Sequence, residues 1–414
     1  MSRWTIVQWL TCGFLLISLC IIALLFAKSS IRVGMFFSLA PFLLIAFAAI
    51  VTNPYWGLVA LFVINYFIMG ISRYVSTTAL GVSTDAMIIL TIASFIYQAA
   101  FKGDISWERA KNNPLIKLLA VWLVFCLIEV INPSSVFQAW MSTIRPYAIY
   151  PFFTVLFATL LFNRYNALKT ILNLWSVFTL LAFIKLIIQE QFGFDNAELR
   201  WLLQGGGSTH ILSTGTRYFS FFTDAGNFGS NMGCAMVVFS ICAMAVKNKG
   251  LKLYYMFIAM IAAYSMFLSG TRGALAVPFA GYIMYILLSK NVKSMVVVGF
   301  LVIGSFVFFN YTSIGQGNAT IRRMRTAFDM NDASLNVRKE NQKILSVYMK
   351  TKPFGEGLGL SGTEAIKYAP GRITTLPNDS WFVKIWVETG IVGLYFHIGL
   401  LLFAVGYGAF IILK

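Results

Sequence analysis

Residues 252–289 read KLYYMFIAMIAAYSMFLSGTRGALAVPFAGYIMYILLS, two apolar runs joined by one short polar turn that holds a single arginine. Each run is long enough to cross a bilayer as a helix, which takes about 20 predominantly apolar residues. Such runs recur along the 414 residues, of which 58% are apolar and 11% charged, whereas soluble domains carry about 25% charged residues. This composition predicts a polytopic helical membrane protein. It excludes a cytosolic enzyme, a secreted disulfide scaffold and a disordered chain, and the continuous runs argue against a β-barrel.

The apolar runs predict an all-α fold of about twelve transmembrane helices in one polytopic domain over residues 1–414. We expect spans near 5–27, 35–51, 56–71, 84–101, 115–131, 147–162, 168–189, 228–246, 252–269, 273–289, 293–310 and 390–413. The run at 5–27 is too long for a typical signal peptide and is interpreted as a retained span. Twelve Lys and Arg lie on the side of the termini and five in the short loops opposite, which predicts cytoplasmic termini.

This topology places two long loops outside, at about 190–227 and 311–380. The second contains ten Lys and Arg and six Asp and Glu. Within it, a helix is expected from Asp332 or Ser334 to about Lys350, because Val337, Leu345 and Tyr348 fall on one face. We interpret it as an amphipathic helix at the outer membrane surface.

The net charge of +17 and the five cysteines have simple explanations. Cytoplasmic loops of membrane proteins collect Lys and Arg, so the charge does not indicate nucleic acid. All five cysteines lie inside apolar runs without a CxxC pattern, which makes disulfides and structural zinc improbable.

Arg272 is the first candidate site residue. It stands in Ser269-Gly270-Thr271-Arg272-Gly273, between two spans with hardly any loop to hold the charge in water. Free backbone N–H groups at a helix start and a guanidinium together form a phosphate-oxygen site. Alternatively, Arg272 is a helix-end arginine that reaches the membrane interface.

Arg217 is the second candidate. It begins the stretch RYFSFFTDAGN (217–227), which is rich in aromatic and polar residues and leads into a span. The stretch fits an ordered re-entrant segment that lines a cavity. Alternatively, Arg217 is a loop arginine paired with Asp224.

The third candidate stretch, LPNDSWFVKIWVETG (376–390), places Asp379 and Glu388 near the outer end of the last span. A carboxylate in a membrane-facing cleft can act as a general base. Alternatively, Asp379 is a helix N-cap, and Glu388 complements a helix dipole.

Taken together, these segments resemble the O-antigen ligase and O-antigen polymerase superfamily of bacterial inner membranes. Four blocks match in order over roughly residues 200–400: 217–227, 269–273, the stretch from Asn336-Val337-Arg338 to Gly359, and 379–393. Ligases usually carry a His-Asn pair about nine residues before the glutamate of the last block. Here Asn378, Asp379 and Ser380 occupy that region, so the pattern favours a polymerase.

The resemblance implies a GT-C-like membrane glycosyltransferase, inverting and metal-independent, with no cofactor. It would act at the periplasmic face of the inner membrane on a glycan carried by undecaprenyl diphosphate. The acceptor would be another lipid-linked glycan in a polymerase, or lipid A core in a ligase. A partner that regulates chain length is suggested by the family alone.

The chemistry of a diphosphate leaving group and a hydroxyl acceptor suggests roles for the candidates. Arg217 and Arg272 would stabilise the diphosphate and Asp379 would take the acceptor proton. The residues expected to bind substrate are Arg338, Glu388, Tyr218, Asp224 and Trp381. For Tyr218 and Trp381 the role would be stacking on sugars, although aromatic residues are common at any membrane interface.

Two other classes remain open. A transporter or lipid flippase is disfavoured because the polar features gather at one face rather than at mid-membrane. A purely structural membrane subunit would leave the three arginines unexplained.

Overall fold

The computed structural model describes residue 41 and residues 44–74, 77–101, 107–162, 165–212, 215–328, 333–371, 373–378 and 380–414. The chain divides into two compact units, residues 1–61 with 85–105 and residues 62–84 with 106–414. The expected span at 5–27 lies outside the described residues.

The first unit contains a short helix at 44–52, the start of α3 (Pro54–Ile71) and most of α4 (Thr77–Phe101). Two contacts join these helices. The Ser94 hydroxyl donates to the Ile50 carbonyl at 2.6 Å, and Gly57 lies directly against the Thr91 side chain. A residue without a Cβ at position 57 therefore allows the helices to approach closely.

The second unit carries the remaining elements. Its first half contains α5 (Trp107–Asn112), α6 (Pro114–Ile128), η1 (Glu129–Ile131), α7 (Phe137–Ile144), η2 (Arg145–Ile149), α8 (Tyr150–Leu161), α9 (Tyr165–Gln191), α10 (Asn196–Trp201), η3 (Leu202–Gly206) and α11 (Gly207–His210). After the strands β1 (Ile211–Leu212) and β2 (Gly215–Thr216) follow α12 (Ala225–Ala245), α13 (Lys249–Leu268), η4 (Arg272–Leu275), α14 (Ala276–Leu288) and α15 (Val292–Tyr311). The last elements are α16 (Ala319–Arg325), η5 (Thr326–Phe328), α17 (Ala333–Met349), η6 (Thr363–Lys367), η7 (Ile373–Thr375) and α18 (Trp381–Leu413).

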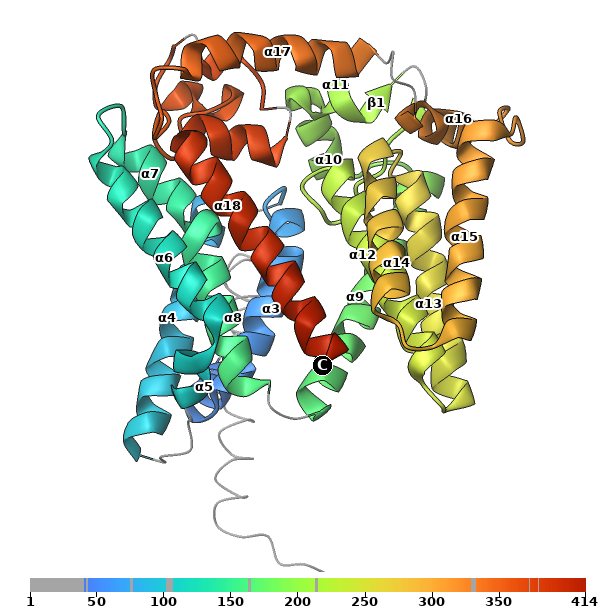
Figure 1. Cartoon of the computed structure of the whole chain (residues 1–414), viewed down its shortest axis with the longest axis horizontal. Coiled ribbons are helices and arrows are strands. Elements are labelled where there is room, and N and C mark those ends of the chain that lie inside the picture. The colour runs from blue at the N-terminus through green and yellow to red at the C-terminus, as the bar shows by residue number, and fades with distance from the viewer. Residues whose placement is uncertain are drawn as a thin grey trace, which may run out of the picture. The chain divides into compact units, whose positions relative to one another are not determined.

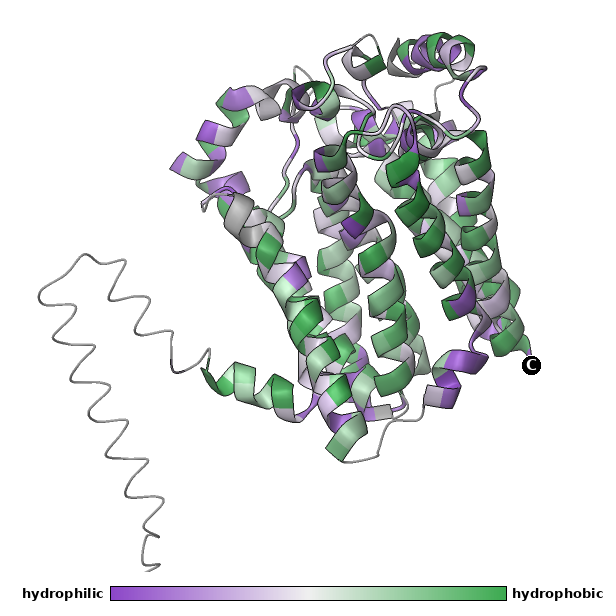
Figure 2. Ribbon diagram, turned by 90° about the vertical axis from the view of Figure 1, so that its left-hand side faces the viewer, coloured by the Kyte–Doolittle hydropathy of each residue, from purple (hydrophilic) through white to green (hydrophobic). Residues whose placement is uncertain are grey.

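The all-α prediction is confirmed, since β1 and β2 form only a two-residue antiparallel pair in the described chain. In that part, nine helices are long and apolar enough to cross a membrane: Pro54–Ile71, Gly81–Phe101, Pro114–Ile131, Phe137–Leu161, Asn166–Gln191, Ala225–Ala245, Lys249–Leu268, Val292–Tyr311 and Trp381–Leu413. The shorter apolar helix Arg272–Leu288 occupies the expected span at 273–289. Hydrophobic residues run along the helices, and hydrophilic residues gather towards their ends (Figure 2). The chain is a polytopic membrane protein.

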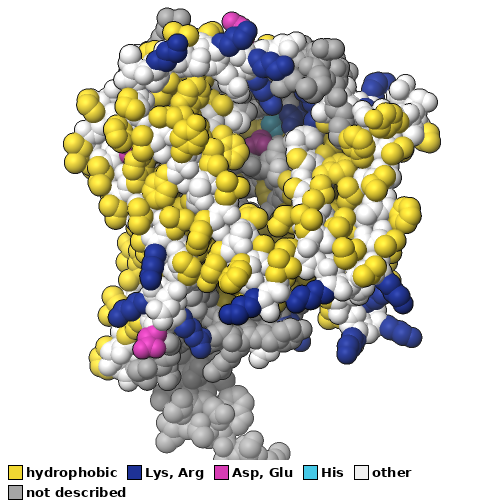
Figure 3. All heavy atoms as spheres, in the orientation of Figure 1, with side chains coloured by type: hydrophobic (Ala, Val, Ile, Leu, Met, Phe, Trp, Pro, Cys, Tyr) yellow, Lys and Arg dark blue, Asp and Glu magenta, His cyan; other side chains and the backbone are white. Residues whose placement is uncertain are grey.

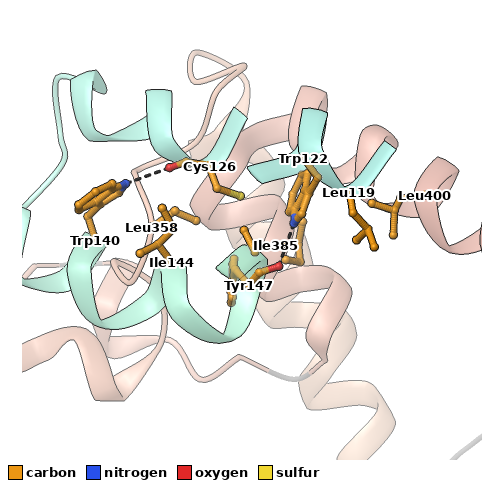
Figure 4. Packing of buried hydrophobic residues seen from close by; sticks show 10 residues of the cluster. Leu119, Trp122, Cys126, Trp140, Ile144, Tyr147, Leu358, Ile385 and Leu400 are labelled. Carbon is orange, nitrogen blue, oxygen red and sulfur yellow. Dashed lines mark hydrogen bonds between the residues drawn. The ribbon is translucent and has the colours of Figure 1, made fainter. Parts of the chain in front are cut away.

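Two clusters of buried side chains organise the second unit. In one, Trp122 on α6 and Trp140 on α7 donate to the carbonyls of Tyr147 and Cys126, each at 2.9 Å (Figure 4). In the other, Gly229 and Gly233 let α12 lie directly against residues 266–278, where Met266 is buried. The second cluster includes Ala274 and Leu275, next to Arg272.

The helix α17 confirms the amphipathic helix expected in the long second loop. It lies across the ends of α18 and its neighbours (Figure 1). Leu345 and Met349 are buried against Val383 and Val387 of α18. Val337 and Tyr348, which are expected on the apolar face, are 59% and 36% exposed, because Leu345 and Met349 make the buried contacts of the helix.

The last helix is broken, a feature that the apolar run at 390–413 does not predict. Gly390 has a positive φ of 68° inside α18, and a side chain there would overlap the Pro353 carbonyl. Trp381 Nε1 donates to His397 Nε2 at 3.1 Å, although sixteen residues would separate them by about 24 Å along a straight helix. The segment before Gly390 therefore folds back on the segment that follows, and the expected span at 390–413 is only the second part of α18.

Candidate functional site

Burial and hydrogen bonds to α9 fix the conformation of the segment 217–224. Phe219 is fully buried. Ser220 has a positive φ of 49°, which is uncommon outside glycine. Its N–H donates to Gln189 Oε1 at 3.0 Å and its hydroxyl donates to the Ala182 carbonyl at 2.8 Å. The segment is therefore an ordered turn anchored on α9, as expected for a stretch that lines a cavity.

Arg73, just after α3, secures the same segment from its other side. Its guanidinium donates to the carbonyls of Ser220, Phe222 and Thr223. It also lies over the rings of Phe219 and Trp201, at 4.4 and 4.8 Å from their centroids. In the sequence Arg73 is one of the Lys and Arg of the short outer loops, and nothing local shows that three carbonyls about 150 residues away converge on it.

His210 links the start of α12 to the preceding loop. Its Nδ1 donates to the Gly206 carbonyl at 2.8 Å, and its Nε2 accepts from the Ala225 N–H at 3.0 Å. This pattern requires the neutral imidazole. Burial lowers the pKa of His210, the bond to Gly206 partly offsets this, and the Arg217 charge lowers it again. The Thr209 hydroxyl also lies 2.9 Å from Nδ1, so both ring nitrogens of His210 have partners.

Arg217 meets the turn between α13 and η4. Its Nη2 donates to Thr271 Oγ1 at 2.9 Å, and its Nη1 donates to the Thr209 carbonyl at 2.8 Å. Gly270, with a φ of 58°, sits against the aliphatic part of the Arg217 side chain. The two sequence blocks that contain Arg217 and Arg272 are therefore in direct contact.

Asp224 does not take Arg217 as its main partner, contrary to the alternative interpretation of a simple ion pair. Its carboxylate caps α12 by accepting from the Asn227 N–H at 2.9 Å and from Asn227 Nδ2 at 3.0 Å. It still acts on Arg217 through its charge. Asp224 thus positions the start of α12 beside the arginines.

A third arginine reaches this turn from α16. Arg323 Nε donates to the Gly270 carbonyl at 2.7 Å, and Arg272 Nη1 donates to Thr326 Oγ1 at 3.1 Å. The fully buried Met324 packs with the residues of α12–α14 and holds α16 in place. We refer to Arg217, Arg272 and Arg323 as the arginine node. The run RRMR (322–325) was the only sequence signal for Arg323.

The node combines partial burial with like charges. Burial lowers the pKa of Arg217, the Asp224 charge raises it, and the neighbouring Arg272 charge lowers it again. A cavity of about 330 Å³ borders the node, with Tyr218, Gly270, Arg323 and Glu190 among its walls. Burial raises the pKa of Tyr218, and the Glu190 charge adds to this. Like charges held this close favour an anion, which supplies the countercharge and accepts several hydrogen bonds.

Figure 3 shows charged and histidine side chains gathered in a hollow on one face, between apolar surfaces. Lys and Arg are prominent at its walls, with Asp or Glu beside them. A hollow of this composition near the helix ends is suited to a polar, anionic ligand.

The stretch that follows residue 376 forms a second group, around the break in α18. Glu388 is fully buried, and its Oε1 accepts from the Ser361 hydroxyl at 2.5 Å. Asn378 Nδ2 in turn donates to Ser361 Oγ at 3.1 Å. The loop is hydrogen-bonded to the chain at the break. The N–H groups of Glu356 and Gly357 donate to the Val387 and Glu388 carbonyls at 2.9 and 3.0 Å. Glu388 is thus held by the loop rather than free at a helix start.

The remaining site residues expected in this region from the sequence are Asp379, Trp381 and Arg338. Asp379 lies outside the described residues. The N-cap of α18 is Ser380, whose Oγ accepts from the Val383 N–H at 3.2 Å, so the interpretation of Asp379 as the cap is wrong. Trp381 is 45% exposed and is held by His397 and by the Tyr147 ring. Arg338 is exposed on α17, the helix that packs on α18.

Two comparisons with known proteins match part of the chain. Residues 256–398 match the family described as O-Antigen ligase. The chain is also similar to a Salmonella muenchen protein named O-antigen polymerase, with 28% identity over 190 residues. That alignment covers 43% of this chain and 43% of the relative, so less than half of the relative's length is matched. No solved structure matches the chain.

Proposed function

We propose that this chain, which carries an O-antigen ligase family domain over residues 256–398, transfers a glycan from undecaprenyl diphosphate to a hydroxyl acceptor. At the level of the family, the function is that of an O-antigen polymerase- or ligase-type glycosyltransferase. The finer proposal is a GT-C-like, inverting and metal-independent enzyme of the bacterial inner membrane, with its site at the periplasmic face. The observation that carries it is the arginine node at the Gly270 turn.

The node suits the leaving group of this reaction. When the bond between the anomeric carbon and the phosphate oxygen breaks, undecaprenyl diphosphate keeps the electron pair and gains negative charge. Arg217 and Arg272 are each anchored by a threonine hydroxyl, and Arg323 by a carbonyl. Donors fixed in advance stabilise developing charge without reorganisation during the reaction, which is the largest catalytic contribution in many enzymes.

The acceptor hydroxyl would attack the anomeric carbon from the face opposite the leaving group, which inverts its configuration. We propose that the Asp379 carboxylate takes the hydroxyl proton. Its neighbour Asn378 is tied through Ser361 to the buried Glu388, so Glu388 supports this stretch of chain. Arg338 and Trp381 are proposed to bind the glycan, and both are exposed.

Polymerisation is the preferred form of the reaction, in which the acceptor is another lipid-linked repeat unit. It rests on the missing histidine before Asp379 and on the name of the Salmonella relative. The alternative is ligation to lipid A core, which the description of the matched family favours.

A deletion strain complemented with wild type or Arg272→Ala tests the proposal. We expect the variant to insert into the membrane but to lose transfer by about 10²–10³-fold, the usual effect of removing one charge-stabilising donor. Lipid A core with a single repeat unit and no longer glycan would identify a polymerase, whereas full-length polymer left on undecaprenyl diphosphate would identify a ligase. Normal polymer made by Arg272→Ala would contradict the role of the node.

A further inference from the structure

We propose that a second cavity, next to Arg73, is the subsite that holds the acceptor glycan; this inference rests on the proposed function. The cavity has a volume of about 370 Å³, which is within the range of small-molecule sites. Its polar walls are Ser72, Arg200, Gln204 and Thr223.

The position of the cavity relates it to the arginine node. Thr223 lines this cavity, and Tyr218 lines the cavity beside the node. Both residues belong to the segment 217–224, which Arg73 secures through three carbonyls. One ordered segment therefore borders both cavities, and two ligands bound there would be neighbours. A transferase that joins two substrates needs this arrangement.

The charges distinguish the two cavities. The node presents three guanidiniums beside Glu190 and Asp224. At the second cavity, the charge of Arg73 is countered by Glu198, Asp224 and Asp195, and its guanidinium already donates to carbonyls, so the exposed Arg200 is the cation that faces a ligand there. The node therefore attracts a diphosphate more strongly, and the second cavity is left for a ligand with little net charge.

The remaining walls suit a sugar ring. Gln204 and Arg200 are exposed at the cavity and offer an amide and a guanidinium to hydroxyl groups. The Trp201 ring, over which the Arg73 guanidinium lies at 4.8 Å, adds an apolar wall to the cavity. A few convergent polar groups on an apolar wall are the usual composition of a small-molecule site. The geometry thus assigns the cavity to the sugar that offers the attacking hydroxyl.

The test uses the purified full-length protein in nanodiscs and a synthetic, lipid-free glycoside of one repeat unit as the acceptor. The variants are Gln204→Ala and Arg200→Ala, and the matched control is Gln316→Ala, which removes another exposed amide from a loop outside the cavity. Because one or two hydrogen bonds are lost, we expect the acceptor Kd and KM to rise about tenfold in both variants. The KM for the lipid-linked donor and kcat at saturating acceptor should stay at the wild-type values, as should all constants of the control.

Equal acceptor Kd values for wild type and both variants would overturn the assignment, as would a change confined to the donor KM. The proposed function can fail separately. If wild type binds the acceptor, and binds it more tightly than Gln204→Ala does, but transfers no glycan, the result contradicts transfer. The cavity would then still be a glycan-binding site. Both cavity residues are exposed, so a variant that keeps the wild-type Tm reports on binding rather than on folding.

Discussion

The three guanidiniums of the arginine node are held by different partners, and this difference gives a prediction at the scale of single residues. Arg323 and Arg322 are consecutive on α16, but only Arg323 donates to the Gly270 carbonyl. Arg322 is exposed and donates to the Gln316 carbonyl. Sequence alone ranks these two arginines equally.

We expect Arg323→Ala to reduce the transfer rate by about 10–100-fold, because a donor beside the leaving group and the anchor of the Gly270 turn are lost together. Arg322→Ala should transfer at close to the wild-type rate. Initial rates with purified protein and saturating donor measure both. Equal losses in the two variants would show that α16 contributes only general positive charge.

His210 gives a prediction at the scale of elements. Its hydrogen bonds join the loop at Gly206 to Ala225, the first residue of α12. Its pKa is lowered from 6.5 in the folded protein, with Arg217, Asp224 and Arg73 as the charges around it. The unfolded chain therefore takes up this proton first as the pH falls. The stability contributed by the neutral imidazole is complete above about pH 6.5 and decreases below it.

Accordingly, the Tm of wild type should fall between pH 7 and pH 5 by more than that of His210→Gln, which should start from a lower Tm. Thermal unfolding at one scan rate across this pH range measures both slopes. Equal slopes of Tm against pH in the two proteins would mean that the pKa of His210 does not change on unfolding.

The break in α18 gives the second prediction at this scale. Ala at position 390 would place a Cβ against the Pro353 carbonyl, at a positive φ that costs roughly 1–2 kcal/mol in itself. Gly399 lies in the same helix with no atom close to the position of a Cβ. Gly390→Ala should therefore lower the Tm by several degrees, and Gly399→Ala should leave it unchanged or raise it. A Gly390→Ala protein as stable as Gly399→Ala would contradict the folded-back geometry.

At the scale of the molecule, the sequence predicts the positions of the helices but not the contacts between them. Apolar runs of sufficient length determine where spans form, so the expected spans from residue 56 onward coincide with helices. Arg272 was proposed because it is a charge in a short turn between two apolar runs, and Arg217 because it begins a polar and aromatic stretch that leads into a span. Arg323 was missed because its direction depends on the burial of Met324, a contact between distant parts of the chain.

The break at Gly390 was missed for a similar reason. Inside an apolar run, Gly390 and Gly399 look the same, and only the loop from Pro353 distinguishes them. Neither local propensity nor hydrophobic periodicity reports such contacts. Residues that are brought together from sequence-distant segments, such as Ser361 and Glu388, can be assigned only from the folded chain.

The most direct test of the central claim is transfer by the purified protein. Proteoliposomes containing wild type or Arg272→Ala would be incubated with a fluorescent, undecaprenyl-diphosphate-linked repeat unit, and the products separated by size. The account predicts a ladder of longer lipid-linked glycans and released undecaprenyl diphosphate with wild type, and neither with the variant. Unchanged substrate with folded wild type, when lipid A core is also supplied as an acceptor, would contradict it.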